Sequence, residues 1–332
     1  MKAFIIDRYG KADVVRAGDM PEPQLRADDV LVRIHAASVN PLDLKIRDGE
    51  FKLLLPYRLP LILGNDMAGV VVRVGAGVRR FNVGDEVYAR PDDDRIGTFA
   101  EFIAIKEESL ALKPKTLTME QAAAMPLVAL TAWQALVEKG RLKKGQKVLI
   151  HAGTGGVGTV AIQLAKHLGA TVATTASAAN APMLKQLGAD IVIDYKKDDF
   201  ALRLRDYDLV LDSQGGATLK KSLGVLKPGG KVIGIAGPPD PDFARERGVN
   251  ALVGLVMRVL SYGIRSKAKA AGVNSFLYMR ASGEQLRQIA DLIDAGAIRP
   301  VIDRVFPFDE TREALAYVET GRSKGKVVIK VG

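Results

Sequence analysis

A glycine-rich loop between an apolar strand and a helix constrains the fold of this chain more than any other feature. The loop has the spacing G-x-G-x-x-G and reads Gly153-Thr154-Gly155-Gly156-Val157-Gly158. It follows the apolar run Val148–Ile150 and precedes a helical pattern of apolar residues. Glycine permits a tight turn here, and it lets the main chain approach a pyrophosphate. This context predicts a dinucleotide site at a helix N-terminus, rather than a loop that only joins strand to helix.

Strands and helices alternate over much of the chain. Parallel strands need crossover helices, so the alternation predicts an α/β fold with a doubly wound parallel sheet. An N-cap at Thr118 begins an apolar helical run toward Leu136. The predicted strands are Lys147–His151, Thr171–Thr175, Ile191–Asp194, Leu209–Asp212, Lys231–Ile235 and Phe276–Met279. The predicted helices are Gly158–Leu168, Ala181–Leu187 and Thr218–Leu226.

Residues 1–115 have a different pattern, with short apolar runs separated by turn signals. Many short strands with tight turns predict a barrel-like domain. The runs are Lys2–Ile6, Asp29–Ala36, Ala68–Val74, Glu86–Ala89 and Ala100–Ile105. After residue 283 we expect an amphipathic helix, Gly283–Ala295, and two edge strands near Val301–Phe306 and Lys326–Val331.

Composition excludes several classes of function. A chain of 332 residues exceeds the usual size of one core, so two domains are expected. The absence of cysteine excludes disulfides, thiolate metal ligands and a cysteine nucleophile. The net charge of +10 is scattered and accompanies no nucleic-acid-binding motif, so we expect no nucleic-acid partner. No apolar run reaches the ~18 residues of a membrane span and no secretory signal is evident, so a cytoplasmic location is expected.

The end of the second predicted Rossmann strand indicates which nicotinamide nucleotide binds. NAD sites usually place an acid there, about twenty residues after the glycine loop. Here the sequence is Thr174–Asn180, with no acid until Asp190. Ser177 and Asn180 can donate hydrogen bonds to a 2′-phosphate, and nearby lysines (Lys185, Lys196, Lys197) add positive charge. NADPH is therefore expected, although the same small polar residues could also cap the next helix.

Motifs along nearly the whole chain resemble the zinc-independent quinone oxidoreductase group of the medium-chain dehydrogenase/reductase superfamily, and most of all its reticulon-interacting oxidoreductase branch. Besides the glycine loop, the motifs are Ala37–Asp43, Leu63–Val71, Gly75 with Phe81–Asp85, Gly97–Glu101, Leu130–Trp133, Leu187–Asp190 with Asp194-Tyr195, Asp212–Gly216 and Gly325–Ile329.

The resemblance implies a Rossmann domain, residues 123–280, inserted into a GroES-like β-barrel catalytic domain, residues 1–122 and 281–332. It also implies a homodimer through an edge of the Rossmann sheet. The nicotinamide would lie near Asn40 and Thr131, and Tyr195 near the 2′-phosphate. The remaining cofactor-binding residues would be Ser213, Ile235, Gly237, Phe276, Tyr278 and Lys326.

One departure from the zinc-dependent relatives is informative. Those enzymes bind zinc through Cys, then His in a Gly-His-Glu motif, then Cys. This chain has Asn40 near the first position and Gly64-Asn65-Asp66 at the second, and its three histidines are dispersed. A zinc site needs at least three N, S or O donors in fixed geometry, so no metal site is expected. His151, at a strand end, is interpreted as structural.

Without a Lewis acid, an electrophilic acceptor is easier to reduce than a plain alcohol is to oxidise. The sequence and the resemblance therefore predict NADPH-dependent hydride transfer to a quinone or an α,β-unsaturated carbonyl. The candidates for polarising or orienting the acceptor are Asn40 and Tyr57, with Lys45 and Asp43 behind them. Tyr57 could equally be an ordinary half-buried loop residue, and Asp43 could hold its loop through a backbone bond. The proton could come from solvent.

Two alternatives and one segment stay open. The chain could be a dedicated reductase for the C=C bond of enoyl, alkenal or unsaturated-acid substrates, or a redox sensor that binds NADPH without turnover. Residues 250–272 combine an apolar run with Arg258, Arg265, Lys267 and Lys269. Such a basic amphipathic segment can lie on a membrane, but we expect it to cover the substrate cleft or a subunit contact.

Overall fold

The computed structural model describes residues 1–52, 55–236 and 273–332, which form two compact units. Unit 1 contains Met1–Leu130 and Arg280–Gly332, and unit 2 contains Thr131–Met279. The first boundary was expected after residue 122, but it lies after Leu130. Helix α2 (Met119–Ala123) packs on strands of unit 1, which keeps this part of the chain with the first unit. Gly237 and the basic segment 250–272 lie outside the described residues.

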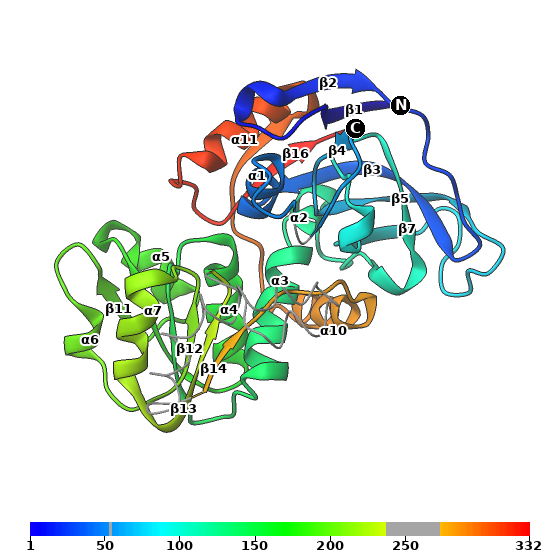
Figure 1. The fold of residues 1–332 in the computed structure, drawn as a ribbon. Coiled ribbons are helices and arrows are strands. Elements are labelled where there is room, and N and C mark those ends of the chain that lie inside the picture. Colours follow the sequence, from blue (N-terminus) through cyan, green and yellow to red (C-terminus); the bar gives the residue numbers. More distant parts are fainter. Residues whose placement is uncertain (53–54, 237–272) are drawn as a thin grey trace, which may run out of the picture. The chain divides into compact units, whose positions relative to one another are not determined.

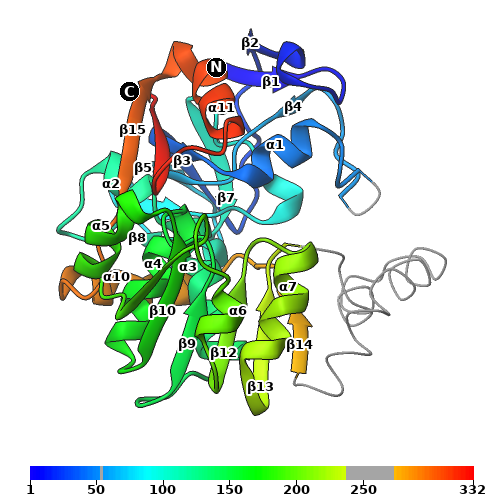
Figure 2. The same ribbon diagram turned by 90° about the vertical axis from the view of Figure 1, so that its left-hand side faces the viewer.

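Unit 2 is built on a parallel six-stranded sheet. Its order is β11-β10-β9-β12-β13-β14, and Figure 2 shows β10, β9, β12, β13 and β14 side by side. The strand order reverses direction between β9 and β12, which is where doubly wound sheets bind their ligands. The strands are β9 (Lys147–Ile150), β10 (Thr171–Ala176), β11 (Ile191–Asp194), β12 (Tyr207–Asp212), β13 (Leu226–Gly234) and β14 (Val273–Phe276).

Crossover helices connect these strands, as the sequence pattern predicted. They are α4 (Gly156–His167), α5 (Ala181–Gln186), α6 (Phe200–Arg203) and α7 (Gly216–Ser222). One buried cluster joins the sheet to the helices through Leu149, Val210, Phe200 and Leu219. The doubly wound fold is therefore confirmed. The last strand was expected at Phe276–Met279, but it ends at Phe276.

Unit 1 contains an antiparallel β-sheet and a larger mixed one, and it carries both ends of the chain (Figure 1). A three-stranded sheet has the order β2-β1-β4, from β1 (Lys2–Ile6), β2 (Val15–Asp19) and β4 (Leu61–Ile62). The larger sheet has the order β15-β16-β3-β5-β6-β8, and β7 also pairs with β3. Its strands are β3 (Asp29–Val39), β5 (Met67–Val74), β6 (Glu86–Ala89), β7 (Phe102–Lys106), β8 (Leu110–Leu112), β15 (Ile302–Pro307) and β16 (Lys326–Lys330).

Strand β16 brings the end of the chain into this sheet, between β15 and β3. It runs antiparallel to β3, with Val327 opposite Val39. Lys326, the residue before Val327, therefore lies beside the end of β3, where α1 (Pro41–Arg47) begins. Helix α10 (Gly283–Asp294) joins the same unit, since the hydroxyl of Tyr88 on β6 donates to the carbonyl of Leu286 at 2.6 Å. Helix α11 (Thr311–Glu319) packs on β15 and β16.

The helix expected from Thr118 toward Leu136 is interrupted. The capping box is confirmed: Thr118 Oγ accepts the N–H of Gln121, and the Gln121 side chain accepts the N–H of Thr118. The first helix ends at Ala123, and α3 (Pro126–Trp133) starts at a proline. Proline disfavours helical conformation in the residue before it, which explains the break. A π-helical segment, Gln134–Lys139, follows α3. In the described part of the chain, no helix combines the length and apolar character needed to cross a membrane.

Candidate functional site

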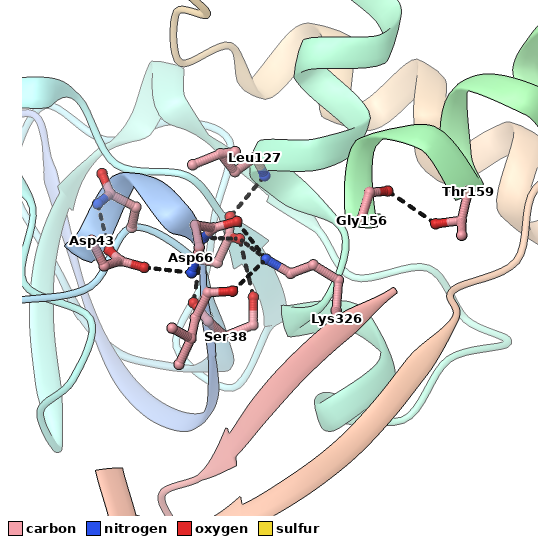
Figure 3. Close-up of polar contacts among 10 residues, drawn as sticks. Ser38, Asp43, Asp66, Leu127, Gly156, Thr159 and Lys326 are labelled. Carbon is pink, nitrogen blue, oxygen red and sulfur yellow. Dashed lines mark hydrogen bonds and ion pairs between the residues drawn. The ribbon is translucent and has the colours of Figure 1, made fainter. Parts of the chain in front are cut away.

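The glycine loop of unit 2 is closely packed against neighbouring side chains and main chain. A Cβ on Gly153 would come within 2.2 Å of Thr174 Oγ1, and one on Gly158 within 2.4 Å of the Ala152 carbonyl oxygen. These two glycines are therefore required by the protein itself. The next helix is tied by its own polar contact, since Thr159 Oγ1 donates to the Gly156 carbonyl at 3.0 Å (Figure 3).

Gly155 has no such structural requirement. It is the N-cap residue of α4, with φ −75° and ψ 167°, which any residue can adopt. A Cβ at this position would meet only the Ala152 carbonyl oxygen, at an ordinary 3.4 Å. Bare main chain at an open helix N-terminus fits close approach by a pyrophosphate, because the first-turn N–H groups of a helix lack partners within the helix. The loop thus fits a dinucleotide.

A buried polar chain lies directly behind this loop. The two ring nitrogens of His151 contact Thr175 Oγ1 at 3.1 Å and Ser222 Oγ at 2.9 Å. Thr175 Oγ1 also accepts the N–H of Ala152 at 3.2 Å. Burial lowers the pKa of His151 to about 4, so the ring is neutral near pH 7. Asp212 is buried beside Ser222, and burial raises its pKa. These hydrogen-bonded side chains link the ends of three strands, β9, β10 and β12, under the loop.

The predicted 2′-phosphate residues gather at the carboxyl ends of β10 and β11. Asn180 Nδ2 donates to Ser177 Oγ at 2.9 Å. The N–H of Tyr195 donates to the Ala176 carbonyl at 3.2 Å, and the Tyr195 side chain is 63% exposed. Lys196 and Lys197 follow it and are exposed. The arrangement provides hydroxyl, amide and ammonium donors. Residue 177 is a serine, where NAD sites usually have a carboxylate.

Other residues expected to line the cofactor follow the remaining strands of unit 2. Ser213 follows β12, Ile235 follows β13, and Phe276 ends β14. The N–H of Ile235 donates to the Asp212 carbonyl at 2.8 Å, which places two of these strand ends side by side. Tyr278 is half-buried just beyond β14, and Thr131 is buried in α3.

In unit 1, a second cluster surrounds the buried carboxylate of Asp66 (Figure 3). Its Oδ2 accepts hydrogen bonds from Ser38 Oγ at 3.0 Å and Asn40 Nδ2 at 2.8 Å, and it lies 3.2 Å from Lys326 Nζ. Its Oδ1 accepts the N–H of Leu127 at 2.7 Å. Four donors therefore compensate one buried negative charge.

Asn40 connects this carboxylate to a second one, Asp43. The N–H of Asn40 donates to Asp43 Oδ2 at 2.6 Å, and Asn65 Nδ2 donates to Asp43 Oδ1 at 2.7 Å. The backbone bond that the sequence left open as one role for Asp43 is therefore present. Complete burial raises the pKa of Asp43 to about 7, an effect that the two hydrogen bonds and Lys326 only partly oppose and that Asp66 reinforces. Oδ1 of Asn65 is buried without a hydrogen-bond partner among the described residues.

Two of the predicted site residues, Lys326 and Asn40, have their side-chain polar atoms bonded within unit 1 rather than free for a ligand. The ammonium of Lys326 donates to Asn40 Oδ1, the Val39 carbonyl and Asp66, which are three acceptors for its three hydrogens. The amide of Asn40 is 1% exposed and bonded at both ends. Tyr57 is half-buried against the core formed by residues such as Phe4 and Leu63.

Sequence reasoning assigned no role to Asp66 or Ser38. Both lie within quoted motifs, but a carboxylate just before an apolar strand gives no indication of its partners. In the described ranges 1–52, 55–236 and 273–332, no three His, Cys, Asp or Glu side chains are grouped as metal ligands would be. The residues near the zinc-ligand positions of metal-dependent relatives, Asn40 and Asn65, instead hydrogen-bond to the buried carboxylates.

Two family models match the chain. Residues 26–115 match the alcohol dehydrogenase GroES-like domain, and residues 187–329 match the family described as zinc-binding dehydrogenase. The GroES-like match falls in unit 1. The second match starts in unit 2 and ends in β16 of unit 1, which reflects the insertion of one unit into the other.

Related proteins match over nearly the whole chain. The mouse protein named NAD(P)H oxidoreductase RTN4IP1, mitochondrial, is 38% identical over 360 residues, covering 100% of this chain and 89% of the relative. The tomato (Solanum lycopersicum) 2-methylene-furan-3-one reductase is 38% identical over 340 residues, covering 99% of this chain and 79% of the relative.

Solved structures agree with these relatives. The quinone oxidoreductase of Coxiella burnetii matches with a TM-score of 0.88 and 34% identity, covering 100% of this chain and 99% of that one. The mycobacterial Rv1454c, solved with NADPH, has a TM-score of 0.83 and 29% identity, with both chains fully covered. The glycine loop, the Rossmann sheet, the GroES-like unit and these similarities together show that the chain belongs to the medium-chain dehydrogenase/reductase superfamily, as a member of its quinone oxidoreductase group.

Proposed function

We propose that this protein is an oxidoreductase that uses NADPH to reduce a quinone or an α,β-unsaturated carbonyl compound. The observation that carries the proposal is the bare main chain of Gly155 at the N-terminus of α4. The protein itself has room for a Cβ at this position, so the space is open to a pyrophosphate. The names of the relatives support the reaction class, since they include a quinone oxidoreductase, an NAD(P)H oxidoreductase and a furanone reductase.

The residues of unit 2 divide the binding of NADPH among them. The loop from Gly153 to Gly158, including Thr154, Gly156 and Val157, would bind the pyrophosphate through main-chain N–H groups. Ser177, Asn180 and Tyr195 would contact the 2′-phosphate, with positive charge from Lys196 and Lys197. When bound, NADPH supplies the hydride. Ser213, Ile235, Gly237, Phe276 and Tyr278 would contact the rest of the cofactor, and Thr131 the nicotinamide.

We propose that the reaction needs no zinc. The chain has no cysteine, and an asparagine stands at the position of the metal-binding histidine. The buried Asp66 is already compensated by the ammonium of Lys326, 3.2 Å away. A metal cation beside that ammonium would face strong repulsion in this buried setting. Elemental analysis of the purified protein tests this proposal: stoichiometric zinc, together with loss of activity on its removal, would contradict it.

Acceptor orientation is assigned to the region of Asn40 and to Tyr57. The amide of Asn40 is held by Asp66 and Lys326, so it is a fixed surface for the acceptor rather than a mobile hydrogen-bond donor. Tyr57 packs on the core, so Tyr57→Phe would keep its packing and remove only the hydroxyl. A fall in kcat/KM with unchanged unfolding temperature would assign a role to that hydroxyl. Equal kcat/KM would leave Tyr57 as a core residue, and the proton would then come from solvent.

A dedicated C=C reductase is the second candidate. It is favoured by the furanone reductase and by the Arabidopsis thaliana protein named NADPH-dependent alkenal/one oxidoreductase, chloroplastic, which is 36% identical and covers 99% of this chain and 79% of the relative. NADPH oxidation followed at 340 nm with matched quinones, enones and alkenals decides between the two. Turnover of enones and alkenals alone would favour the C=C reductase. Tight NADPH binding without turnover of any acceptor would favour a redox sensor.

We also propose a homodimer that forms through an edge of the six-stranded sheet, whose edge strands are β11 and β14. Light scattering on the purified protein tests this assembly, and a monomeric mass would contradict it. For location we propose the cytoplasm, which suits a chain without cysteine. The mouse and Arabidopsis relatives are named mitochondrial and chloroplastic, so fractionation of the source cell is the deciding measurement.

A further inference from the structure

The orientation of the Asn40 amide is fixed by two groups of opposite chemistry. An ammonium can only donate, and the one of Lys326 donates to Asn40 Oδ1. An ionised carboxylate can only accept, and the one of Asp66 accepts from Asn40 Nδ2 at 2.8 Å. With the amide turned over, its N–H₂ group would face the ammonium and its oxygen would face the carboxylate. Both contacts would be repulsive, so the pair selects one orientation.

Lys326 reaches this position from the far end of the chain. It begins β16, whose antiparallel pairing with β3 sets Val327 opposite Val39, and so brings the lysine beside the end of β3. Its side chain is 5% exposed, and all three of its ammonium hydrogens have acceptors within unit 1. No hydrogen of this ammonium is left for a cofactor phosphate or a substrate oxygen.

We propose that Lys326 is a positioning residue of the reductase: together with Asp66 it holds the side-chain amide of Asn40 in the orientation that hydride transfer requires, without contacting the cofactor. This inference rests on the proposed function. It replaces direct cofactor binding as the role of Lys326. The last strand of the chain thereby controls a loop nearly three hundred residues earlier.

Asn40 is a point from which such control can act on a reaction. It is the N-cap residue of α1, and its own N–H is held by Asp43 at 2.6 Å. Its side chain and main chain are thus fixed by separate partners. Loss of the Lys326 contact would leave the helix start in place but would remove one of the two contacts that fix the amide, so that Asp66 alone would oppose its reversal. Small misplacements of orienting groups can cost about 100-fold in rate.

A matched control exists in the same unit. Lys113 has a side chain that is 7% exposed, and its ammonium donates to the carbonyls of Pro114 and Leu117 and lies 3.2 Å from Glu86. It is as buried as Lys326 and also bonds two carbonyls and a carboxylate. Among the described residues it bonds no side-chain amide. Lys113→Met therefore reproduces the loss of a buried ammonium without the loss of amide orientation.

The test compares Lys326→Met, Lys326→Gln and Lys113→Met with the wild type. For each protein we would measure kcat with a quinone, NADPH affinity by fluorescence titration, and unfolding temperature. Lys326→Met should lower kcat by about 10- to 100-fold, with NADPH affinity within about twofold of the wild type. Lys326→Gln keeps one donor for Asn40 Oδ1 and should recover part of kcat. Lys113→Met should keep the kcat of the wild type.

The double variant Asp66→Asn/Lys326→Met separates positioning from stability. It removes both buried charges, so the unfolding temperature should recover relative to Lys326→Met alone. The new amide at position 66 keeps an oxygen for the N–H of Leu127 and turns its N–H₂ group toward Asn40, which favours the reversed amide. Stability should therefore return while kcat stays low. Recovery of kcat together with stability would reduce Lys326 to a structural role and overturn the inference.

The remaining outcomes also discriminate. A rise in the NADPH dissociation constant of Lys326→Met by more than about tenfold, with kcat unchanged, would assign Lys326 to cofactor binding and overturn the inference. Wild-type kcat in Lys326→Met would do the same and leave the proposed function intact. A wild-type protein that binds NADPH but reduces no acceptor would instead overturn the proposed function, and with it any role of Lys326 in turnover.

Discussion

Gly158 passes so close to the carbonyl oxygen of Ala152 that a methyl group on its Cα would lie 2.4 Å from it. The same Cβ would be within 2.8 Å of Gly153 Cα, so the contact is between two backbone segments and no flexible side chain can yield. We therefore expect Gly158→Ala to lower the free energy of unfolding by about 1–3 kcal/mol, a usual cost of overpacking. Urea denaturation without cofactor measures it. Unchanged stability would mean that strand and helix can separate here.

Gly155 should respond in the opposite way. Its dihedral angles suit any residue, and a Cβ there meets only one protein atom, at 3.4 Å. We expect Gly155→Val to keep the unfolding temperature of the wild type and to lose NADPH affinity, because the side chain would occupy the space that the pyrophosphate needs. Titration of intrinsic fluorescence with NADPH gives the affinity. Gly224→Val is a suitable control, because that glycine has open space around it. Gly84 also has open space, but its φ of +96° makes a valine there strained.

The sequence predicted the elements whose signals are local. The glycine loop lies between β9 and α4 because an apolar run, a turn of glycines and a helical pattern follow one another within about twenty residues. The capping box at Thr118 formed as expected. Helix α11 escaped prediction because its nine residues form a short amphipathic pattern after a strand, with a weak N-cap at Glu310.

The Asp66 cluster shows what local signals cannot provide. Its members come from β3, the turn before β5, the start of α3 and the start of β16. The sequence separation between Lys326 and Asp66 is 260 residues, and only the pairing of β16 with β3 brings them together. A family resemblance could place Asn40 and Lys326 in one site, but it could not state that one holds the other. That relationship depends on strand register, which no short motif encodes.

Ser177 should determine the preference between NADPH and NADH. It follows β10, is half-buried, and accepts a hydrogen bond from Asn180. Ala176 is 3% exposed, so Ser177 is the better position for a new charge. We expect Ser177→Asp to weaken NADPH binding by repulsion of the 2′-phosphate and to strengthen NADH binding through the ribose 2′-OH. The ratio of kcat/KM for the two cofactors measures the shift.

A surface variant provides the charge control for this prediction. Leu202→Asp, on the exposed face of α6, changes the net charge by the same amount and should leave the cofactor ratio unchanged. If Ser177→Asp keeps the wild-type preference, the assignment of the 2′-phosphate to Ser177, Asn180 and Tyr195 is wrong.

Asp43 should make the protein less stable as the pH rises. Burial raises its pKa from 3.8 to about 7, with Asp66 adding to the effect and Lys326, Asn65 and Asn40 opposing it. Between these two values the native state binds more protons than the unfolded chain, so stability falls as the pH rises from about 4 to about 7, by at most about 1.4 kcal/mol per pH unit. Asp43→Asn cannot titrate and should flatten this slope. Its new amide can also pair with Asn65 Oδ1, which lacks a partner in the described residues.

His151 should act in the opposite direction. Burial lowers its pKa from 6.5 to about 4, so between these values the unfolded chain binds the proton that the native state excludes. Stability should therefore fall as the pH drops from 6.5 toward 4, again by at most about 1.4 kcal/mol per pH unit. His151→Gln retains a donor for Ser222 and cannot titrate, so its stability should depend less on acid.

The two titrations overlap and oppose each other between about pH 4 and 6.5, so the wild-type protein should show a weaker pH dependence there than either variant. Urea unfolding at half-unit steps of pH should give a profile that rises with pH for Asp43→Asn, where only His151 titrates of the two. It should give a profile that falls with pH for His151→Gln, where only Asp43 does. Slopes of the same sign in both variants would mean that one of these two buried groups does not hold the charge state that its burial implies.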